Sequence, residues 1–330
     1  VRSRGLGDVY KRQILYNNVA LIGLGLIASS IGHGLKKNGL CKSISGYAKT
    51  SKTRKKAIEL NIVDKICETA KEAVIDADLI IISTPIGVMG DVAKEIAPAL
   101  KKGATLTDVG SVKEDVISLI EPHLPSSVHF IPGHPVAGTE RSGPESGFAE
   151  LFYDRWCLLT PVPNTDQFAL SKLIEMWEKL GARVDTMDAK HHDLVLAVTS
   201  HSPHLIAYTM VGVADDLRRV TNSEVVNYSA AGFRDFTRIA ASDPTMWRDV
   251  FLHNKEATLE ILGRFTEELF SLQRAIRKGD GNFLHEYFSR TRKIRRGIVE
   301  AGQDTDCLLY TSDAADDTPC VDLGGRRIIK

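Results

Sequence analysis

Three side chains able to do chemistry lie within residues 131–143, which read IPGHPVAGTERSG. His134 is followed closely by Glu140 and Arg141, in a stretch so rich in glycine and proline that we expect an exposed loop, neither helix nor strand. An imidazole has a pKa near neutral and therefore suits general acid–base catalysis. The residue type alone leaves two interpretations open: a catalytic histidine, or a loop histidine that only hydrogen-bonds the backbone.

A second group of imidazoles lies in the TSHSPH stretch at 199–204. His201 and His204 are three residues apart on an expected helix, a spacing that could suit a metal ion. No third ligand is evident in the sequence, so we expect no metal site. The HHD stretch at 191–193 reads as the solvated first turn of a helix.

The stretch GFRDFTRIAASDPTMW at 232–247 contains an arginine in otherwise apolar surroundings. Arg234 presents a planar fork of donors that matches a carboxylate. The alternative is a structural ion pair with Asp235. Met246 and Trp247 are expected to pack in the core.

A glycine-rich turn follows the first apolar run of the chain. The run VALI (19–22) leads into GLGLIA (23–28) and then into a helical pattern, which is the strand–turn–helix setting of the dinucleotide fingerprint. Gly23 permits the tight turn, Gly25 lets a pyrophosphate approach the backbone, and the helix N-terminus faces the phosphates. The expected cofactor-binding residues of this turn are Gly23, Leu24, Gly25, Leu26 and Ile27.

The second expected strand, SISGY (43–47), ends without the acidic residue that usually binds the ribose 2′-hydroxyl of NAD. Lys49, Lys52 and Arg54 follow and could accept a 2′-phosphate; alternatively, they are solvated charges at the start of a helix. We expect NAD as the cofactor, with NADP as the alternative, and we include Lys49 among the cofactor-binding residues.

Short apolar runs alternate with helical patterns in the first half of the chain, and long helical patterns follow. This order indicates parallel strands joined by crossover helices, then an all-helical segment. We expect an α/β fold with a Rossmann-type dinucleotide-binding domain at 14–187, a helical substrate domain at 188–306, and an active site between them. The expected strands are 19–22, 43–47, 79–83, 105–108, 129–131 and 156–160, and the expected helices include 52–60, 89–100, 188–216, 254–276 and 282–299.

The composition narrows the functional class. The 330 residues are 43% hydrophobic and 25% charged, as in soluble globular proteins. The formal net charge is zero, which gives no electrostatic reason to expect nucleic acid or an anionic membrane as a partner. No apolar run is expected to span a membrane. Cys41, Cys67 and Cys157 are scattered without a CxxC spacing and read as free thiols of a reducing cytoplasm.

The two ends of the chain encode the same short DNA in opposite orientations. DVYKRQ at 8–13 back-translates to GATGTGTATAAGAGACAG, and the reverse complement, shifted by one base, encodes the CLLYTS found at 307–312. This coincidence indicates sequencing-adaptor read-through. We therefore expect that residues 1–13 and 307–330 are not native and contribute nothing to the fold.

Five ordered motifs make the chain resemble the prephenate/arogenate (cyclohexadienyl) dehydrogenase family of tyrosine biosynthesis. They are GLGLIA, TDVGSVK, GHPVAGTERSG, TSHSPH and GFRDFTRIAASDP, and the likeness covers nearly all of 17–305. The resemblance implies oxidative decarboxylation of prephenate to 4-hydroxyphenylpyruvate, or of arogenate to tyrosine, with NAD or NADP. It further implies a homodimer that pairs through the helical domain. The chain departs from the family at Ala28, where glycine is common, and in the missing acidic residue near Ala48.

The resemblance also implies a role for each site residue. His134 contacts the ring hydroxyl of the substrate, and Ser111 supports both substrate and histidine. Glu140 and His201 line the same pocket, and Arg234 receives a substrate carboxylate. These residue types agree with the chemistry, because the hydroxyl needs a base as hydride leaves the carbinol carbon, and the two carboxylates need cationic or donor groups.

Two other classes of protein remain open. A Rossmann dehydrogenase acting on a hydroxy acid or an imine commonly has a lysine on an interdomain helix, where this chain has TSHSPH and GFRD. A non-enzymatic nucleotide sensor would not require Ser111, His134 and Arg234 to converge. Neither a mutase segment before the fingerprint nor a regulatory domain after Asp306 is visible, so we expect a monofunctional enzyme.

Overall fold

The computed structural model describes residues 14–139, 141–221 and 231–300, without the side chains of 217–221. The chain divides into two compact units, one ending at Arg264 and the other beginning at Phe265. Both suspected adaptor segments and Glu140 lie outside the described residues.

A six-stranded parallel sheet forms the centre of the first unit, in the order β3-β2-β1-β4-β5-β6. This is the strand order of a doubly wound dinucleotide-binding fold, and it confirms the expected Rossmann-type domain. Burial on both faces explains why β4 reads as an unbroken apolar run. The strands are β1 (Tyr16–Ile22), β2 (Cys41–Tyr47), β3 (Lys65–Ile66), β4 (Leu79–Ile82), β5 (Thr105–Asp108) and β6 (His129–Phe130).

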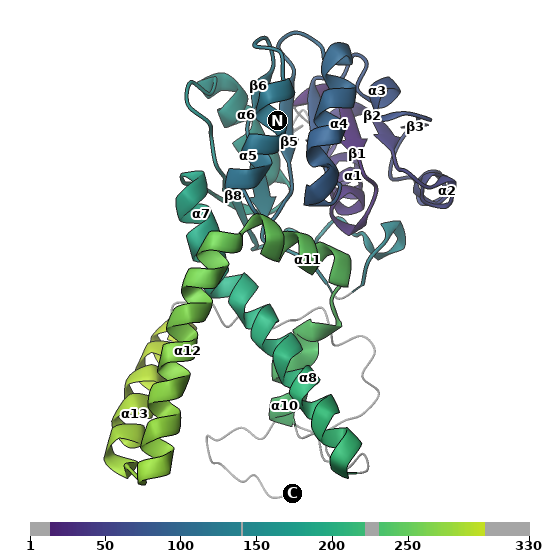
Figure 1. Cartoon of the computed structure of the whole chain (residues 1–330). Helices are drawn as coiled ribbons and strands as arrows, with labels where there is room; N and C mark the ends of the chain where they lie inside the picture. Colours follow the sequence, from purple (N-terminus) through teal and green to yellow (C-terminus); the bar gives the residue numbers. More distant parts are fainter. Residues whose placement is uncertain (1–13, 140, 222–230, 301–330) are drawn as a thin grey trace, which may run out of the picture. The chain divides into compact units, whose positions relative to one another are not determined.

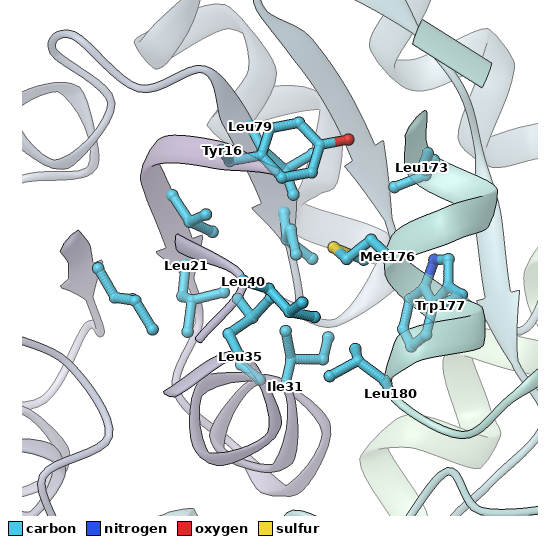
Figure 2. Packing of buried hydrophobic residues seen from close by; sticks show 14 of the residues in the cluster. Tyr16, Leu21, Ile31, Leu35, Leu40, Leu79, Leu173, Met176, Trp177 and Leu180 are labelled. Carbon is cyan, nitrogen blue, oxygen red and sulfur yellow. The ribbon is translucent and has the colours of Figure 1, made fainter. Parts of the chain in front are cut away.

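Helices cover both faces of this sheet. One core cluster joins the sheet to α1, α2 and α6, and a second joins it to α3, α4 and α5. Figure 1 shows α4 and α5 next to each other in front of the sheet. In Figure 2, Ile31 and Leu35 of α1 face Trp177 and Leu180, while Tyr16 of β1 lies beside Leu79 of β4. The helices are α1 (Leu26–Asn38), α2 (Ser51–Glu59), α3 (Ala70–Ala73), α4 (Met89–Ile96), α5 (Glu114–Ile120) and α6 (Gln167–Lys179).

A second, smaller sheet corrects the expectation for GHP. Its strands are β7 (Gly133–Pro135), β8 (Trp156–Leu159) and β9 (Arg183–Thr186), with β7 antiparallel to β8 and β8 parallel to β9. His134 pairs with Leu158 and is only 7% exposed, so the expectation of an exposed loop is wrong at this residue. A proline is tolerated because β7 is an edge strand, where a missing N–H costs least.

Long helices make up the rest of the described chain, which confirms the expected helical second half. A π-helical turn (Ala197–His201) joins α7 to α8, and α12 runs from the first unit into the second. Trp247 is buried as expected, whereas Met246 is exposed. The helices are α7 (Ala189–Leu196), α8 (Ser202–Thr221), α10 (Ala231–Thr237), α11 (Pro244–His253), α12 (Lys255–Lys278) and α13 (Gly281–Ile298).

One helical run differs from the expectation that no segment could span a membrane. Among the described residues, Ala189–Asp216 is long and apolar enough to do so, with a mean hydropathy of 1.2. The apolar core helix of a folded domain satisfies the same two criteria. This run carries buried polar side chains, including Asp193 and His201, and 28% of its most apolar stretch is buried.

Candidate active site

The turn between β1 and α1 has room for a ligand against its backbone. Gly23 has a φ of +90°, and a Cβ there would lie 2.6 Å from the Ser83 carbonyl oxygen, so only glycine fits. A Cβ on Gly25 would meet nothing within 4 Å among the described residues. Leu24 is buried in the core cluster and therefore offers only its backbone to a ligand.

The N-terminus of α1 differs from those of the helices around it. Its N-cap is Gly25, with no side-chain cap, and its first turn contains no acidic residue. An uncapped N-terminus leaves N–H groups and the positive end of the helix dipole for an anion. Side chains cap α2, α6, α7, α11 and α13, through Thr50, Asp166, Asp188, Asp243 and Asp280. The N-cap residues of α4 and α5 also give no side-chain cap, but both of these helices have acidic residues in their first turns.

Two hydroxyl groups that the sequence analysis missed follow β4 directly. Ser83 Oγ and Thr84 Oγ1 are buried and have no hydrogen-bond partner in the part of the chain that the structure describes. Ligands of open α/β sheets bind beyond the carboxyl ends of the strands. These unpartnered hydroxyls, together with the glycine turn, therefore fit a bound dinucleotide. The signal that could have found them is a polar Ser-Thr pair directly after an entirely apolar strand.

The basic residues after β2 are not equivalent. The Arg54 guanidinium donates to the Glu68 carboxylate at 2.7 Å and to the Ala48 carbonyl at 2.9 Å, so structural contacts hold it in place. Lys49 and Lys52 are exposed at the same end of the strand. The two lysines are therefore better placed than Arg54 to meet a ribose or its phosphate.

A chain of hydrogen bonds joins one carboxylate to two imidazoles. Asp193 Oδ1 lies 2.8 Å from His192 Nδ1, and His192 Nε2 lies 2.9 Å from His134 Nδ1. All three side chains are buried, so the expectation that 191–193 is a solvated turn is wrong for His192 and Asp193. Only His191 is exposed.

The burial of Asp193 has a local cause at the start of α5. Its carboxylate accepts the backbone N–H groups of Lys113 and Glu114 at 2.8 and 2.9 Å. These N–H groups have no partner within α5, because they belong to its first residues. The Asp193 carboxylate satisfies them, which explains why this charged side chain is buried.

A buried ion pair supports the strand that carries His134. The Lys113 ammonium donates to the Asp108 carboxylate and to the Gly133 carbonyl, the latter at 2.6 Å, and both charged side chains are fully buried. Asp108 also accepts the N–H groups of Gly110 and Gly133 at 2.7 and 3.2 Å. The pair thus connects the end of β5 to the residue before His134. Lys113 and Asp108 belong to the TDVGSVK motif, but their pairing was not among the predictions from the sequence.

His201 reaches the same cluster from the π turn. Asn254 Nδ2 lies 3.0 Å from His201 Nδ1 and donates to the Asp193 carbonyl at 2.8 Å. A regular helix returns to the same face after about seven residues, and the extra residue of a π turn makes this eight. The π turn therefore lets Asp193 and His201 share Asn254.

Ser111 lies close to His201. The Ser111 backbone acts on the His201 ring and raises its pKa, against a larger lowering by burial. No described atom meets hydrogen-bond geometry with His201 Nε2. His204, by contrast, stacks on Trp247 with ring centroids 3.7 Å apart. The second histidine of TSHSPH therefore has a packing role.

Burial keeps the imidazoles of this cluster neutral near pH 7. It lowers the pKa of His134 well below the usual value, and the neighbouring His192, Lys113 and His201 add to this effect. Burial also lowers the pKa of His192, against the opposing influence of Asp193. The pKa of His201 falls to about 4. A neutral imidazole has a lone pair that can accept a proton, and the lowered pKa makes it a weaker base than a solvated histidine.

The segment after β7 connects the histidine strand to α1. The Phe148 N–H donates to Ser30 Oγ at 3.1 Å, and a Cβ on Gly147 would lie 2.5 Å from the Cβ of Ser29. Gly147 thus permits close contact with the helix that follows the glycine turn. The histidine cluster and the expected cofactor turn are in this way parts of one packed unit.

Two expected substrate-binding residues do not join this cluster. Arg234 is exposed on α10, and none of the hydrogen bonds among the described residues links it to the buried histidines. Glu140 lies outside the described residues. Within the described ranges, no group of three or more His, Cys, Asp or Glu side chains is arranged to hold a metal ion.

Comparison with known proteins assigns both parts of the chain to one family. Residues 31–186 match the nucleotide-binding domain of prephenate dehydrogenase, and residues 188–290 match the dimerization domain of prephenate dehydrogenase. A cyclohexadienyl dehydrogenase of Zymomonas mobilis is 42% identical over 270 residues, which cover 82% of this chain and 92% of that protein. A prephenate dehydrogenase of Bacillus subtilis is 33% identical, over 81% of this chain and 72% of that protein.

A solved structure agrees with these matches. The prephenate dehydrogenase of A. aeolicus, in complex with hydroxyphenyl propionate and NAD+, has a TM-score of 0.80 and 33% sequence identity. The alignment covers 86% of this chain and 98% of that one. Sequence, fold and domain order therefore agree, and the chain belongs to the prephenate dehydrogenase family of oxidoreductases.

Proposed function

We propose that the protein catalyses the oxidative decarboxylation of prephenate to 4-hydroxyphenylpyruvate, or of arogenate to tyrosine, with reduction of NAD+ or NADP+. The observation that carries this proposal is the hydrogen-bonded chain Asp193–His192–His134, which ends at a neutral imidazole. Membership of the family and the names of the relatives support the substrate class. They also favour it over a hydroxy-acid or imine dehydrogenase.

The dinucleotide fits the turn described above. The backbone of Gly23, Leu24, Gly25, Leu26 and Ile27 would hold its pyrophosphate at the uncapped N-terminus of α1. Ser83 and Thr84 add two hydroxyl partners, and Lys49 lies near the expected place of the ribose. When bound, the nicotinamide accepts a hydride from the carbinol carbon of the substrate. The A. aeolicus relative supports NAD, and NADP remains the alternative.

His134 moves the proton in this reaction. Its unprotonated ring nitrogen accepts the proton of the ring hydroxyl as hydride leaves the same carbon. Loss of carbon dioxide then makes the ring aromatic, and His134 returns the proton to the oxygen to give the phenol. The net change is one hydride and one carbon dioxide removed from the substrate. General acid–base catalysis of this kind contributes about 10²–10⁴-fold to the rate.

The remaining site residues bind and orient the substrate. Ser111 lies beside His201 and supports both the substrate and His134, and His201 shapes the pocket wall. Arg234 and Glu140 bind the polar groups of the substrate, with Arg234 on a carboxylate.

We further propose that the protein acts as a cytoplasmic homodimer, without nucleic acid or membrane partners. The match of residues 188–290 to a dimerization domain supports the dimer. In the proposed division, residues 14–187 bind the dinucleotide and residues 188–306 provide the helical substrate and dimerisation domain. The two terminal segments are proposed to be adaptor read-through.

Steady-state kinetics with the four substrate–cofactor pairs test this function. Reduced cofactor is followed by its absorbance, and the aromatic product is identified by chromatography. Turnover with at least one pair, with equal amounts of reduced cofactor and aromatic product, is the expected result. Absence of turnover with all four pairs, by protein that binds NAD, would contradict the proposal.

A further inference from the structure

The hydrogen bonds of the buried chain Asp193–His192–His134 determine which ring nitrogen of each histidine carries the proton. Asp193 accepts two backbone N–H groups, and such bonds favour the ionised carboxylate. An ionised carboxylate has no proton to donate, so the proton between Asp193 and His192 belongs to His192 Nδ1. Because neutral His192 carries only one ring proton, its Nε2 must be an acceptor.

The same reasoning extends one ring further. His192 Nε2 lies 2.9 Å from His134 Nδ1, and two acceptors cannot form a hydrogen bond. His134 Nδ1 must therefore be the donor in this pair. Among the described residues this is the one side-chain hydrogen bond of His134, so Nε2 keeps its lone pair and faces no competing protein donor.

We infer that His192 and Asp193 are positioning residues, which fix His134 in the Nδ1–H tautomer so that its Nε2 is always ready to accept the substrate proton. The inference rests on the proposed role of His134 as the base. His192 itself touches neither substrate nor cofactor in this scheme. Its contribution is an acceptor placed on the far side of the catalytic ring.

Burial makes this arrangement necessary. In a buried site of low polarity, the N–H group of a neutral imidazole needs an acceptor and its other nitrogen needs a donor. A His134 ring in the Nε2–H form has no lone pair at the nitrogen that must accept the substrate proton. Without an acceptor at the position of His192 Nε2, the proton of His134 gains nothing by staying on Nδ1. A fraction of the enzyme would then hold its base in the inactive tautomer.

Two substitutions at His192 separate tautomer control from packing. His192→Phe keeps a planar ring but removes the acceptor. His192→Gln restores an acceptor, because its amide oxygen can take the place of the Nε2 lone pair while its amide NH₂ faces Asp193. His191→Asn changes the exposed neighbour on the same helix and serves as the control.

The direct measurement is the tautomeric state of His134 by nitrogen-15 NMR, on full-length protein with labelled histidine and saturating NAD. The His134 signals are assigned by their loss in His134→Asn. We expect the Nδ1–H form in the wild type, His191→Asn and His192→Gln, and a population of the Nε2–H form in His192→Phe. The kcat of His192→Phe should fall by about 10–100-fold, and His192→Gln should recover most of this loss.

The outcomes distinguish this inference from the proposed function. An Nε2–H tautomer in the wild type overturns the inference, even if His134→Asn is inactive and the function stands. If the wild type has the Nδ1–H tautomer but His134→Asn is fully active, His134 is not the base, and the hydrogen-bonded chain Asp193–His192–His134 has only a structural role. An unchanged kcat and tautomer in folded His192→Phe also overturns the inference, and the wild-type spectrum decides if that variant does not fold.

Discussion

Buried imidazoles make the stability of this protein depend on pH. The pKa of His201 is about 4 in the folded chain and near 6.5 in an unfolded one, so protonation favours unfolding. The stabilisation of the folded state by neutral His201 is fully present above about pH 6.5 and is lost as the pH falls towards 4. From this one group we expect the free energy of unfolding to fall by up to roughly 3 kcal/mol. His134 and His192 shift in the same direction.

Urea unfolding at several pH values between 7 and 4 measures this loss. His201→Gln should show a smaller decrease than the wild type. His123→Gln, at an exposed histidine, should follow the wild type. Identical pH dependence in the wild type and His201→Gln would show that His201 is not the group responsible.

Arg234 offers a test of substrate binding at a single residue. If its guanidinium binds a substrate carboxylate, Arg234→Gln should raise KM by about tenfold or more, since hydrogen bonds to charged groups contribute about 1.5–3 kcal/mol. The Kd for NAD should stay nearly constant. Steady-state kinetics and a nucleotide titration measure the two quantities, and a KM change below about threefold argues against the role.

Site residues that belong to local sequence motifs could be predicted, whereas residues buried by contacts with distant parts of the chain could not. Ser111, His134 and His201 belong to recognisable motifs, and the structure places them around one buried cluster. His192 and Asp193 were read as a solvated turn, because a polar run at a helix start usually faces water. Their burial depends on the unpaired N–H groups of α5, which lie about 80 residues earlier in the chain. Local sequence carries no signal of that distant pairing.

At the scale of elements, we expect alanine substitutions at the two glycines of the turn before α1 to have different effects on stability and on NAD binding. Gly25 has an ordinary φ of −88° and open space at its Cβ position, so Gly25→Ala should change stability by less than about 1 kcal/mol. The methyl group would occupy space that the pyrophosphate needs, and the Kd for NAD should rise by about tenfold or more.

Gly23→Ala is the matched comparison for this prediction. At a φ of +90°, with a backbone oxygen 2.6 Å from the new Cβ, it should destabilise the fold by about 1–3 kcal/mol. Thermal unfolding without nucleotide and calorimetric titration with NAD measure the two effects. Equal affinity for NAD in Gly25→Ala and the wild type would contradict the assigned phosphate site.

The strands that could be predicted from the sequence differ from those that could not chiefly in their apolar side chains. All six expected strands exist, and three of them, β1, β4 and β8, contain unbroken apolar runs of four residues. β3, β7 and β9 were not predicted. β3 and β7 have only two and three residues, and β9 is mostly exposed and polar, so none shows a hydrophobic pattern. β7 matters most for the proposed function, because it holds His134, the proposed base.

At the scale of the whole molecule, the proposed homodimer can be tested on the second unit. Several large apolar side chains of its helices are exposed, including Leu269, Phe270 and Ile276 on α12 and Phe288 and Ile294 on α13. Light scattering after size-exclusion chromatography should give twice the mass of the 36.3 kDa chain. Phe270→Asp should shift this equilibrium towards the monomer, whereas Gln273→Glu, at an exposed polar position, should not. A monomeric wild type at micromolar concentration would contradict the proposal.

The most direct test of the proposed reaction is the kcat of His134→Asn between pH 6 and 9, measured beside His201→Asn. Asparagine keeps a hydrogen-bonding group but cannot act as the base. We expect kcat of His134→Asn to fall by about 10²–10⁴-fold with a smaller change in KM, because the interaction acts chiefly in the transition state. His201→Asn should lose much less. If His134→Asn keeps a near-normal kcat while His201→Asn abolishes turnover, the base is His201 and the central assignment is wrong.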